Sequence, residues 1–195
     1  MIVPITIGGG KGKRQSAVLT PAQYHMVESK MNADYKIRSN FLLETGLRLA
    51  EARWVDKNRN AFKEENMAIF LPRVEGLGKA RCTIENRAVL LSPKGVQAVK
   101  LFFEKDVHLP SYQAMDLVFK RAARDAGIDP TFFSPKSLRK CHVTWHMVAF
   151  QNRMMQIALS VGHDLITMQG HYLASGWRKD DQKEMIKETE GWSGA

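Results

Sequence analysis

The chain has 195 residues, of which 44% are hydrophobic and 25% charged, and this mixture excludes a chain that is disordered throughout. Its 29 lysines and arginines exceed 20 aspartates and glutamates, and the formal charge of +9 favours a polyanionic partner. Two cysteines are too few for a disulfide framework, and no apolar run is long enough to span a membrane. We therefore expect a cytoplasmic protein with no membrane partner.

The N-terminal residues 1–19 are rich in glycine and basic side chains. Lys11, Lys13 and Arg14 lie beside a run of glycines. A solvated linker and an arm that follows the phosphates of a nucleic acid both fit this composition. We expect this segment to be an arm or linker that precedes one folded unit.

The rest of the chain predicts helices around a short β-hairpin. A serine or threonine followed by proline is typical of a helix start. Between residues 67 and 91, two apolar runs flank Gly76 and Gly78, which predicts an antiparallel hairpin with a basic tip. The expected fold is α+β and mainly helical, with a small antiparallel sheet. Helices are expected from Thr20, Ser92, Ser111 and Ser134, and over residues 35–45, 48–54 and 180–189.

The helix that begins at Ser134 carries cations in its first turns. Lys136 and Arg139 are three residues apart and share one face, and Lys140 adds a third positive charge. Cations beside the exposed N–H groups of a helix start suit a phosphate. Taken alone, these residues favour a solvated basic surface.

Two glycine-containing segments supply further candidates. Gly46 is expected to end one helix and Arg48 to open the next, with Glu51 one turn later. The sequence Val-Gly-His at 161–163 indicates another helix boundary, and Tyr172 follows the histidine after nine residues. Each has an ordinary explanation, as a surface ion pair, a half-buried histidine or a packed tyrosine, but their order along the chain does not.

In this order, the segments resemble the catalytic domain of the tyrosine recombinases, the phage-integrase family. TGLRLAE resembles the first arginine box and GLGKAR the hairpin lysine of that family. SPKSLRK resembles the second box, with lysine in place of the usual histidine, as in archaeal virus integrases of the fusellovirus type. SVGHDLITMQGHY resembles the third box and the nucleophile. The matching residues are Arg48, Lys79, Lys136, Arg139, His163 and Tyr172.

The resemblance implies a chemistry for these residues. Tyr172 would attack a DNA phosphodiester and form a 3′-phosphotyrosine, without a metal, a cofactor or ATP. Arg48 and Arg139 would hold the phosphate oxygens, because a guanidinium is a planar fork of donors. Lys79 would protonate the leaving oxygen, with Arg81, two residues later, as the alternative. His163 and Lys136 would also donate to the phosphate.

The resemblance covers residues 20–175, which we expect to form the catalytic domain. Residues 176–195 form a polar tail that either docks on a neighbouring protomer, as such tails do in this family, or frays as a surface helix. The implied partner is double-stranded DNA at attachment sites, bound by a tetramer of a chain that alone is a monomer or weak oligomer. The expected function is site-specific integration or excision of a viral or plasmid element.

Three other interpretations remain open from the sequence. A type IB topoisomerase uses the same nucleophile and cations, and a non-catalytic DNA-binding module explains the charge alone. His142 and His146 are four residues apart on one helix, as in some metal sites, but Val143 lies where a zinc protease needs its glutamate. A histidine pair within the core is the alternative to that metal site.

Overall fold

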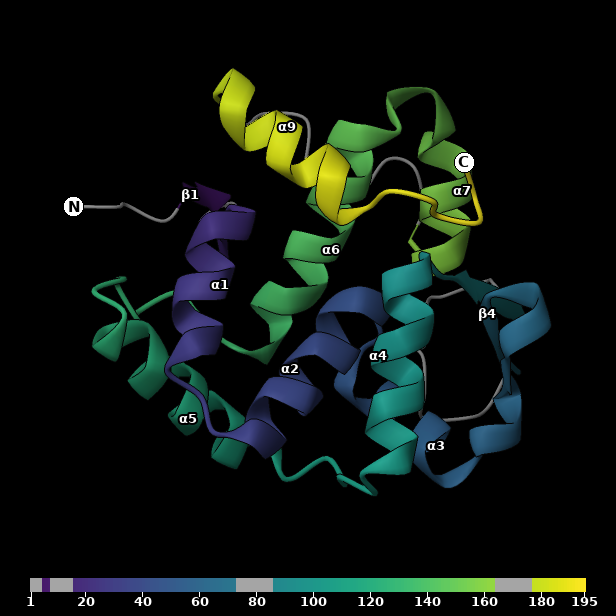
Figure 1. The fold of residues 1–195 in the computed structure, drawn as a ribbon, viewed down its shortest axis with the longest axis horizontal. Helices are drawn as coiled ribbons and strands as arrows, with labels where there is room; N and C mark the ends of the chain where they lie inside the picture. Colours follow the sequence, from purple (N-terminus) through teal and green to yellow (C-terminus); the bar gives the residue numbers. More distant parts are fainter. Residues whose placement is uncertain (1–4, 8–15, 73–85, 164–176) are drawn as a thin grey trace.

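The computed structural model describes residues 5–7, 16–72, 86–163 and 177–195, and the helix α6 runs through its centre (Figure 1). Most residues of α6 are buried, because α2, α5, α7, α9 and β2 all pack against it. None of the helices in these ranges is long and apolar enough to cross a bilayer. The helices are α1 (Pro21–Ser29), α2 (Ala33–Thr45), α3 (Leu49–Lys57), α4 (Pro93–Glu104), α5 (Tyr112–Asp125), α6 (Pro135–Ala149), α7 (Met154–Val161) and α9 (Lys179–Glu188).

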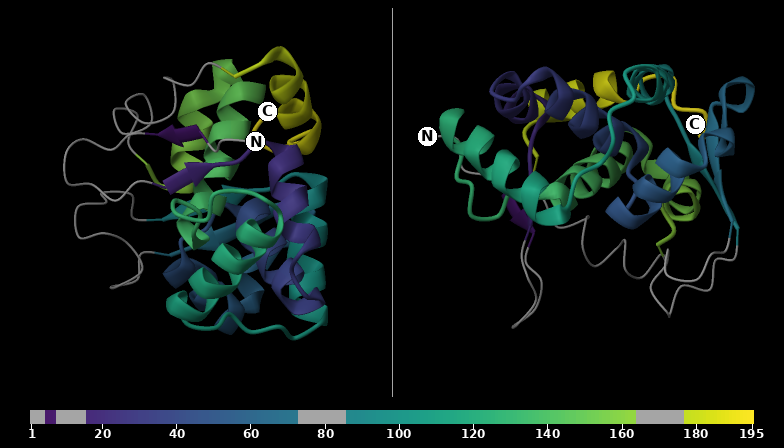
Figure 2. Two further views of the ribbon diagram at one scale, coloured as in Figure 1. Left: turned by 90° about the vertical axis from the view of Figure 1, so that its left-hand side faces the viewer. Right: turned by 90° about the horizontal axis from the view of Figure 1, so that it is seen from below.

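A three-stranded antiparallel sheet lies at one end of the molecule and α5 at the other (Figures 1 and 2). The predicted hairpin is confirmed by two of its strands, in which Ala68 pairs with Leu90 and Leu71 with Arg87. The expected basic tip falls between residues 73 and 85, outside the described residues. The strands are β3 (Phe62–Lys63), β4 (Ala68–Leu71) and β5 (Arg87–Leu90), and short 3-10 turns cover Arg59–Ala61, Glu64–Asn66 and Gln151–Arg153.

The helix starts predicted from serine and threonine are confirmed, and three of these side chains cap their helices. The Thr20 hydroxyl accepts from the backbone N–H of Gln23 at 3.3 Å, and the Gln23 side chain accepts from the N–H of Thr20 at 2.9 Å. The hydroxyls of Ser92 and Ser111 accept from backbone N–H groups at 3.0 and 3.2 Å. These caps fix where α1, α4 and α5 begin.

Two strands that the sequence did not predict precede α1. They are β1 (Ile5–Ile7) and β2 (Ser16–Val18), and they pair antiparallel. Ala17 and Val18 of β2 and the next residue, Leu19, are fully buried. The Leu19 carbonyl accepts from the indole of Trp145 in α6 at 2.9 Å. The packed part of the chain therefore begins before Thr20, the residue at which the folded unit is expected to start.

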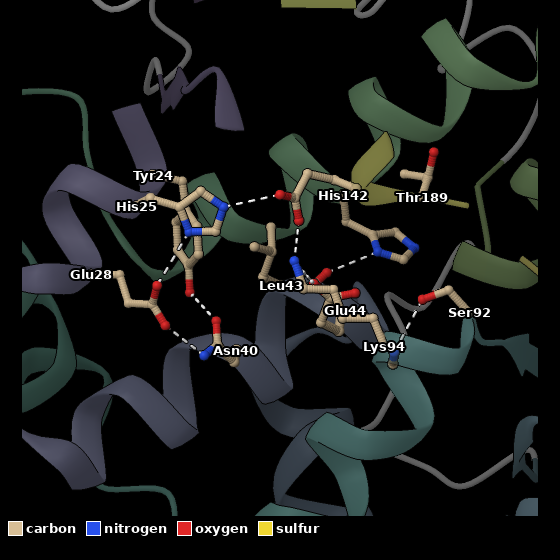
Figure 3. Close-up of polar contacts among 12 residues, drawn as sticks. Tyr24, His25, Glu28, Asn40, Leu43, Glu44, Ser92, Lys94, His142 and Thr189 are labelled. Carbon is tan, nitrogen blue, oxygen red and sulfur yellow. Dashed lines mark hydrogen bonds and ion pairs between the residues drawn. The ribbon is translucent and has the colours of Figure 1, made fainter. Parts of the chain in front are cut away.

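The C-terminal tail packs on its own chain through α9, which occupies residues close to the predicted 180–189. Met185 is fully buried, and the Trp192 indole donates to the carbonyl of Leu90 at 2.9 Å. A polar cluster, shown in Figure 3, adds charged contacts between α9, α1 and α4. In it, Glu188 of α9 accepts from His25 at 3.0 Å and from Lys94.

Candidate active site

Arg48 lies at the turn between α2 and α3. Gly46 ends α2 in the left-handed conformation, with φ of 59°, and Arg48 is the N-cap residue of α3. A Cβ on Gly46 would lie 2.4 Å from the ring of His142, so both the backbone and the available space require glycine. The turn directs the chain from α2 into α3 and leaves the Arg48 side chain 23% exposed.

A second glycine turn ends α7 beside Arg48. Gly162 has φ of 65°, and its carbonyl accepts from Nη2 of Arg48 at 3.1 Å. His163 follows, and its backbone N–H donates to the carbonyl of Ala158 at 2.9 Å. The two glycine-containing segments, more than a hundred residues apart in sequence, therefore meet in space.

Arg139 of α6 donates to backbone carbonyls at the C-terminal ends of both α2 and α7. Its Nη1 donates to the carbonyl of Gly46 at 2.6 Å, and its Nη2 donates to the carbonyl of Val161. The last carbonyls of a helix carry partial negative charge, so the ends of α2 and α7 are suitable partners for a guanidinium. The side chain is 10% exposed, which makes Arg139 the deeper of the two arginines.

One buried carboxylate, that of Glu51, faces three arginines. Its oxygens lie 2.7 Å from Nη1 of Arg48 and 3.7 Å from Nη1 of Arg139. Arg87 of β5 contacts both oxygens, at 3.0 and 2.9 Å. Burial alone would raise the pKa of Glu51, but the hydrogen bond and charge of Arg87, with the charges of the other two arginines, hold this pKa below its ordinary value. Glu51 therefore acts as the shared counter-charge of the site.

The predicted cations of three segments line one cavity of ≈ 370 Å³. Arg48 comes from the start of α3, Lys136 and Arg139 from the start of α6, and His163 from the turn after α7. None of the residues found to line this cavity is acidic. The lining consists of Leu42, Leu47, Arg48, Leu49, Tyr112, Pro135, Lys136, Arg139, Lys140 and His163.

Three helices begin at this cavity. Leu49, Tyr112 and Pro135 are the first residues of α3, α5 and α6, and all three line it. A helix N-terminus carries partial positive charge and unpaired N–H groups, so each of the three favours an anion. Helix ends and side chains therefore contribute charge of the same sign, which suits a phosphate group.

The two lysines of α6 occupy different surroundings. Lys136 is exposed, with its Nζ 5.8 Å from the centre of the Tyr112 ring, a cation–π contact. Lys140 is half-buried, and burial followed by the charge of Lys136 lowers its pKa. An anion in the cavity would relieve the repulsion between the two ammonium groups.

The overall structure resembles solved structures of one transposon integrase bound to DNA. The Tn1549 transposon integrase in complex with a circular intermediate DNA matches with a TM-score of 0.63 at 16% sequence identity, over 92% of this chain and 68% of that chain. The same integrase in complex with transposon right end DNA matches with a TM-score of 0.63 at 15% identity, over the same shares, 92% and 68%. No protein-family model and no curated protein matches the sequence.

The chain has the tyrosine recombinase catalytic-domain fold. This confirms the predicted α+β class, with its mainly helical content and small antiparallel sheet. At this level of identity the match concerns the fold alone, so the roles of individual residues rest on the geometry of the cavity.

The structure brings together the members of the predicted recombinase site that it describes, Arg48, Lys136, Arg139 and His163, and adds Lys140 beside them. The predicted nucleophile, the predicted general acid and its alternative lie outside the described residues, as do the cations of the N-terminal arm. These are Tyr172, Lys79, Arg81, Lys11, Lys13 and Arg14.

Two further residues of the site were missed by sequence reasoning. Tyr112 lines the cavity next to Lys136, and Arg87 of β5 forms an ion pair with Glu51. In the sequence, Tyr112 is one aromatic residue at a helix start and Arg87 one cation at a strand start. Neither position has a local signal, because both meet the site only through the tertiary packing of α5 and β5.

The histidine pair of α6 belongs to the core. His142 and His146 are 3% and 4% exposed, and their ring centres lie 4.1 Å apart. Nδ1 of His142 donates to the carbonyl of Leu43 at 2.8 Å (Figure 3), and Nδ1 of His146 donates to the carbonyl of His142 at 2.8 Å. Burial lowers the pKa of both rings, that of His146 to about 4, so the pair is neutral near pH 7.

Proposed function

We propose that this protein is a tyrosine recombinase that cleaves and rejoins DNA strands through a covalent link to Tyr172. The observation that carries the proposal is the cavity in which Arg48, Lys136, Arg139 and His163 meet from separate parts of the chain. The resemblance of the sequence boxes and the fold shared with a DNA-bound integrase give independent support.

In the proposed reaction, a scissile phosphate occupies the cavity. Arg48 and Arg139 bind its non-bridging oxygens, and His163 and Lys136 donate to the same group. Two guanidiniums fixed by helix ends and by Glu51 need little rearrangement when charge develops on the phosphate. Lysine at position 136 supplies a hydrogen-bond donor and a positive charge to the phosphate.

The covalent step exchanges one phosphate ester for another. The phenol oxygen of Tyr172 releases its proton to water and attacks phosphorus, and the bond from phosphorus to the 5′ oxygen breaks. Lys79, with Arg81 as the alternative, returns a proton to that 5′ oxygen. The phenol has an unperturbed pKa of about 10, and nearby cations favour its ionised form. Because the phosphotyrosine keeps the ester bond energy, rejoining needs neither ATP nor a metal ion.

The proposed biological setting follows from the same family resemblance. We infer integration or excision of a viral or plasmid element in the cytoplasm, with a fusellovirus-type archaeal virus as the suggested source because of the Lys-x-x-Arg box. Recombination joins two double-stranded sites, so a tetramer on DNA is the proposed active assembly. Lys11, Lys13 and Arg14, which lie between β1 and β2 in the sequence, would contact the phosphate backbone.

A nicked duplex that traps the covalent intermediate tests the proposal. Cleavage next to the nick releases a short fragment that diffuses away, so a protein–DNA adduct accumulates and survives denaturation. We expect the adduct with the wild type and with Tyr35→Phe, a control on α2, and its loss with Tyr172→Phe. The yield should be the same with and without EDTA.

The other outcomes separate the competing functions. Tight DNA binding without an adduct contradicts the enzyme and indicates a DNA-binding module. An adduct whose formation EDTA abolishes contradicts the metal-free reaction. An adduct combined with relaxation of supercoiled plasmid, and with no joining of two sites, indicates a type IB topoisomerase.

A further inference from the structure

Arg87 belongs to the hairpin and is partly buried beside Glu51, the carboxylate that faces the arginines of the cavity. It is the first residue of β5, and its side chain is 12% exposed. Nη1 lies 3.0 Å from one oxygen of Glu51, and Nη2 lies 2.9 Å from the other. The Nη1 contact is a hydrogen bond and the Nη2 contact is an ion pair, so the guanidinium holds the buried carboxylate by both a directed bond and its charge.

The same guanidinium also holds the second glycine turn. Nε of Arg87 donates to the carbonyl of Ser160 at 3.0 Å, two residues before Gly162. A Cβ on Gly162 would lie 3.1 Å from Nη1 of Arg87, so the glycine lets the turn lie against the guanidinium. Arg87 thus contacts both structures that orient Arg48, since Arg48 bonds to Glu51 and to the carbonyl of Gly162.

We propose that Arg87 is a positioning residue, which fixes Glu51 and the end of α7 and through them the places of the Arg48 and Arg139 guanidiniums. This inference rests on the proposed function for its effect on DNA cleavage. Arg87 is not among the residues that line the cavity, so its effect is transmitted through Glu51 and the turn rather than by contact with the phosphate.

Charge gives the positioning role a second consequence. Glu51 is buried, and three arginines face it: Arg48 at the start of α3, Arg87 of β5 and Arg139 of α6. Arg87 contributes the largest of the effects that lower the pKa of this carboxyl. Without Arg87, less positive charge offsets the effect of burial, so the pKa of Glu51 rises. Glu51 then becomes protonated, and releases Arg48 and Arg139, at a higher pH than in the wild type.

The test measures single-turnover cleavage of the nicked duplex by Arg87→Gln and Arg87→Lys across pH. We expect Arg87→Gln to lower the cleavage rate by about a hundred-fold, because small displacements of catalytic groups have effects of this size. Its DNA affinity should change by less than about three-fold, and its loss of activity toward acid should begin at a higher pH. Arg87→Lys should recover part of the rate, because it restores one positive charge beside Glu51.

A matched control is Arg59→Gln, because Arg59 also pairs with a carboxylate, that of Asp106, and donates to a backbone carbonyl. It lies in the segment between α3 and β3, so cleavage should stay at the wild-type rate. Melting temperatures of all variants show whether each one is folded at the assay temperature. A rate and pH profile of Arg87→Gln equal to the wild type, or a slow rate with an unchanged pH profile and no recovery by lysine, would overturn the positioning role.

Nitrogen NMR of the arginine side chains keeps the inference separate from the proposed function. In the wild type the guanidiniums of Arg48 and Arg139 should rotate slowly, and in Arg87→Gln they should rotate faster. An unchanged rotation rate contradicts the positioning role, whether or not the protein cleaves DNA. A wild-type protein that forms no adduct, yet shows this difference, contradicts the recombinase and supports the placement of the guanidiniums by Arg87.

Discussion

At the scale of single residues, two glycines bring the arginines together. Gly46 and Gly162 end α2 and α7 in left-handed conformations, and their carbonyls accept from Arg139 and Arg48 respectively. A glycine in such a turn exposes a carbonyl that a helix would otherwise use internally. The glycines of the two sequence boxes therefore serve the geometry of the site through their backbone alone.

A substitution at Gly46 tests this geometry. Gly46→Ala combines the cost of a left-handed alanine, roughly 1–2 kcal/mol, with a clash against His142 that adds about 1–3 kcal/mol. Gly127→Ala is the control, because Gly127 has a similar φ of 73° and no atom within 4 Å of its Cβ position. Chemical denaturation should show the larger loss of unfolding free energy for Gly46→Ala. Equal losses would contradict the close approach of His142.

Arg139 should be essential for cleavage and dispensable for binding. Arg139→Lys keeps the positive charge but loses the fork that joins the carbonyls of Gly46 and Val161. We expect single-turnover cleavage to fall by roughly 10²–10³-fold, the usual effect of removing one preorganised donor, with DNA affinity nearly unchanged. Arg121→Lys, on the exposed face of α5, should cleave like the wild type. A cleavage rate of Arg139→Lys close to wild type would remove Arg139 from the proposed mechanism.

At the scale of elements, α9 closes the core on the side of α6 and α1. Met185 is fully buried, whereas its neighbour Ile186 is 50% exposed. Met185→Ala should therefore lower the free energy of unfolding by about 2–5 kcal/mol, and Ile186→Ala should change it by less than about 0.5 kcal/mol. Denaturation curves of the two variants provide the comparison. Similar values would show that α9 is not docked on its own chain in solution.

The attachment of α9 should weaken in alkaline solution. Hydrogen bonds to Glu188 and then to Glu28 raise the pKa of His25 to about 9, although burial and Lys94 oppose this. A group with a raised pKa stabilises the fold fully below its unfolded pKa, near 6.5, and loses that contribution as pH rises through the folded value. The melting temperature of the wild type should therefore approach that of His25→Gln between about pH 6.5 and pH 9.

The pH dependence of the melting temperature of Glu188→Gln, and that of the wild type in acid, define the contribution of the His25–Glu188 pair. Glu188→Gln removes the same pair from the other side, so it should show the same reduced dependence on pH as His25→Gln. The pKa of Glu188 is lowered to about 2, first by the His25 hydrogen bond, so in the wild type this carboxylate loses its contribution only as pH falls toward that value. If the melting temperatures of the wild type, His25→Gln and Glu188→Gln change equally from pH 6.5 to pH 9, the pair is excluded as a pH-dependent contact.

At the scale of the whole molecule, local signals predicted the elements better than they predicted the site. Serine and threonine caps marked the helix starts, and two apolar runs on either side of a pair of glycines marked the hairpin, because both are properties of short segments. Arg48 and Arg139 were indicated by the resemblance of their segments to the arginine boxes of the tyrosine recombinases. The depth of Glu51, which is 1% exposed, could not be predicted, since a glutamate after an arginine on a helix fits a surface ion pair equally well.

The residues that sequence reasoning missed depend on contacts between distant segments. Arg87 contacts the end of α7 because β5 packs beside that helix, and Tyr112 reaches the cavity because α5 begins next to α6. The strand β2 was missed because a short Ser-Ala-Val segment after many glycines has little local preference. It is ordered by contact with α6 and by the bond from the Ala17 N–H to the carbonyl of Phe132 at 2.7 Å.

The central claim is that a tyrosine of this chain becomes linked to DNA, and peptide mapping of the adduct tests it most directly. Protease digestion of the adduct formed on the nicked duplex leaves a nucleotide on one peptide, which mass spectrometry identifies. We predict that the modified residue is Tyr172, joined to a 3′ phosphate. Attachment at another residue, with Tyr112 in the cavity as the main competitor, or the absence of any nucleotide-linked peptide, would contradict the account.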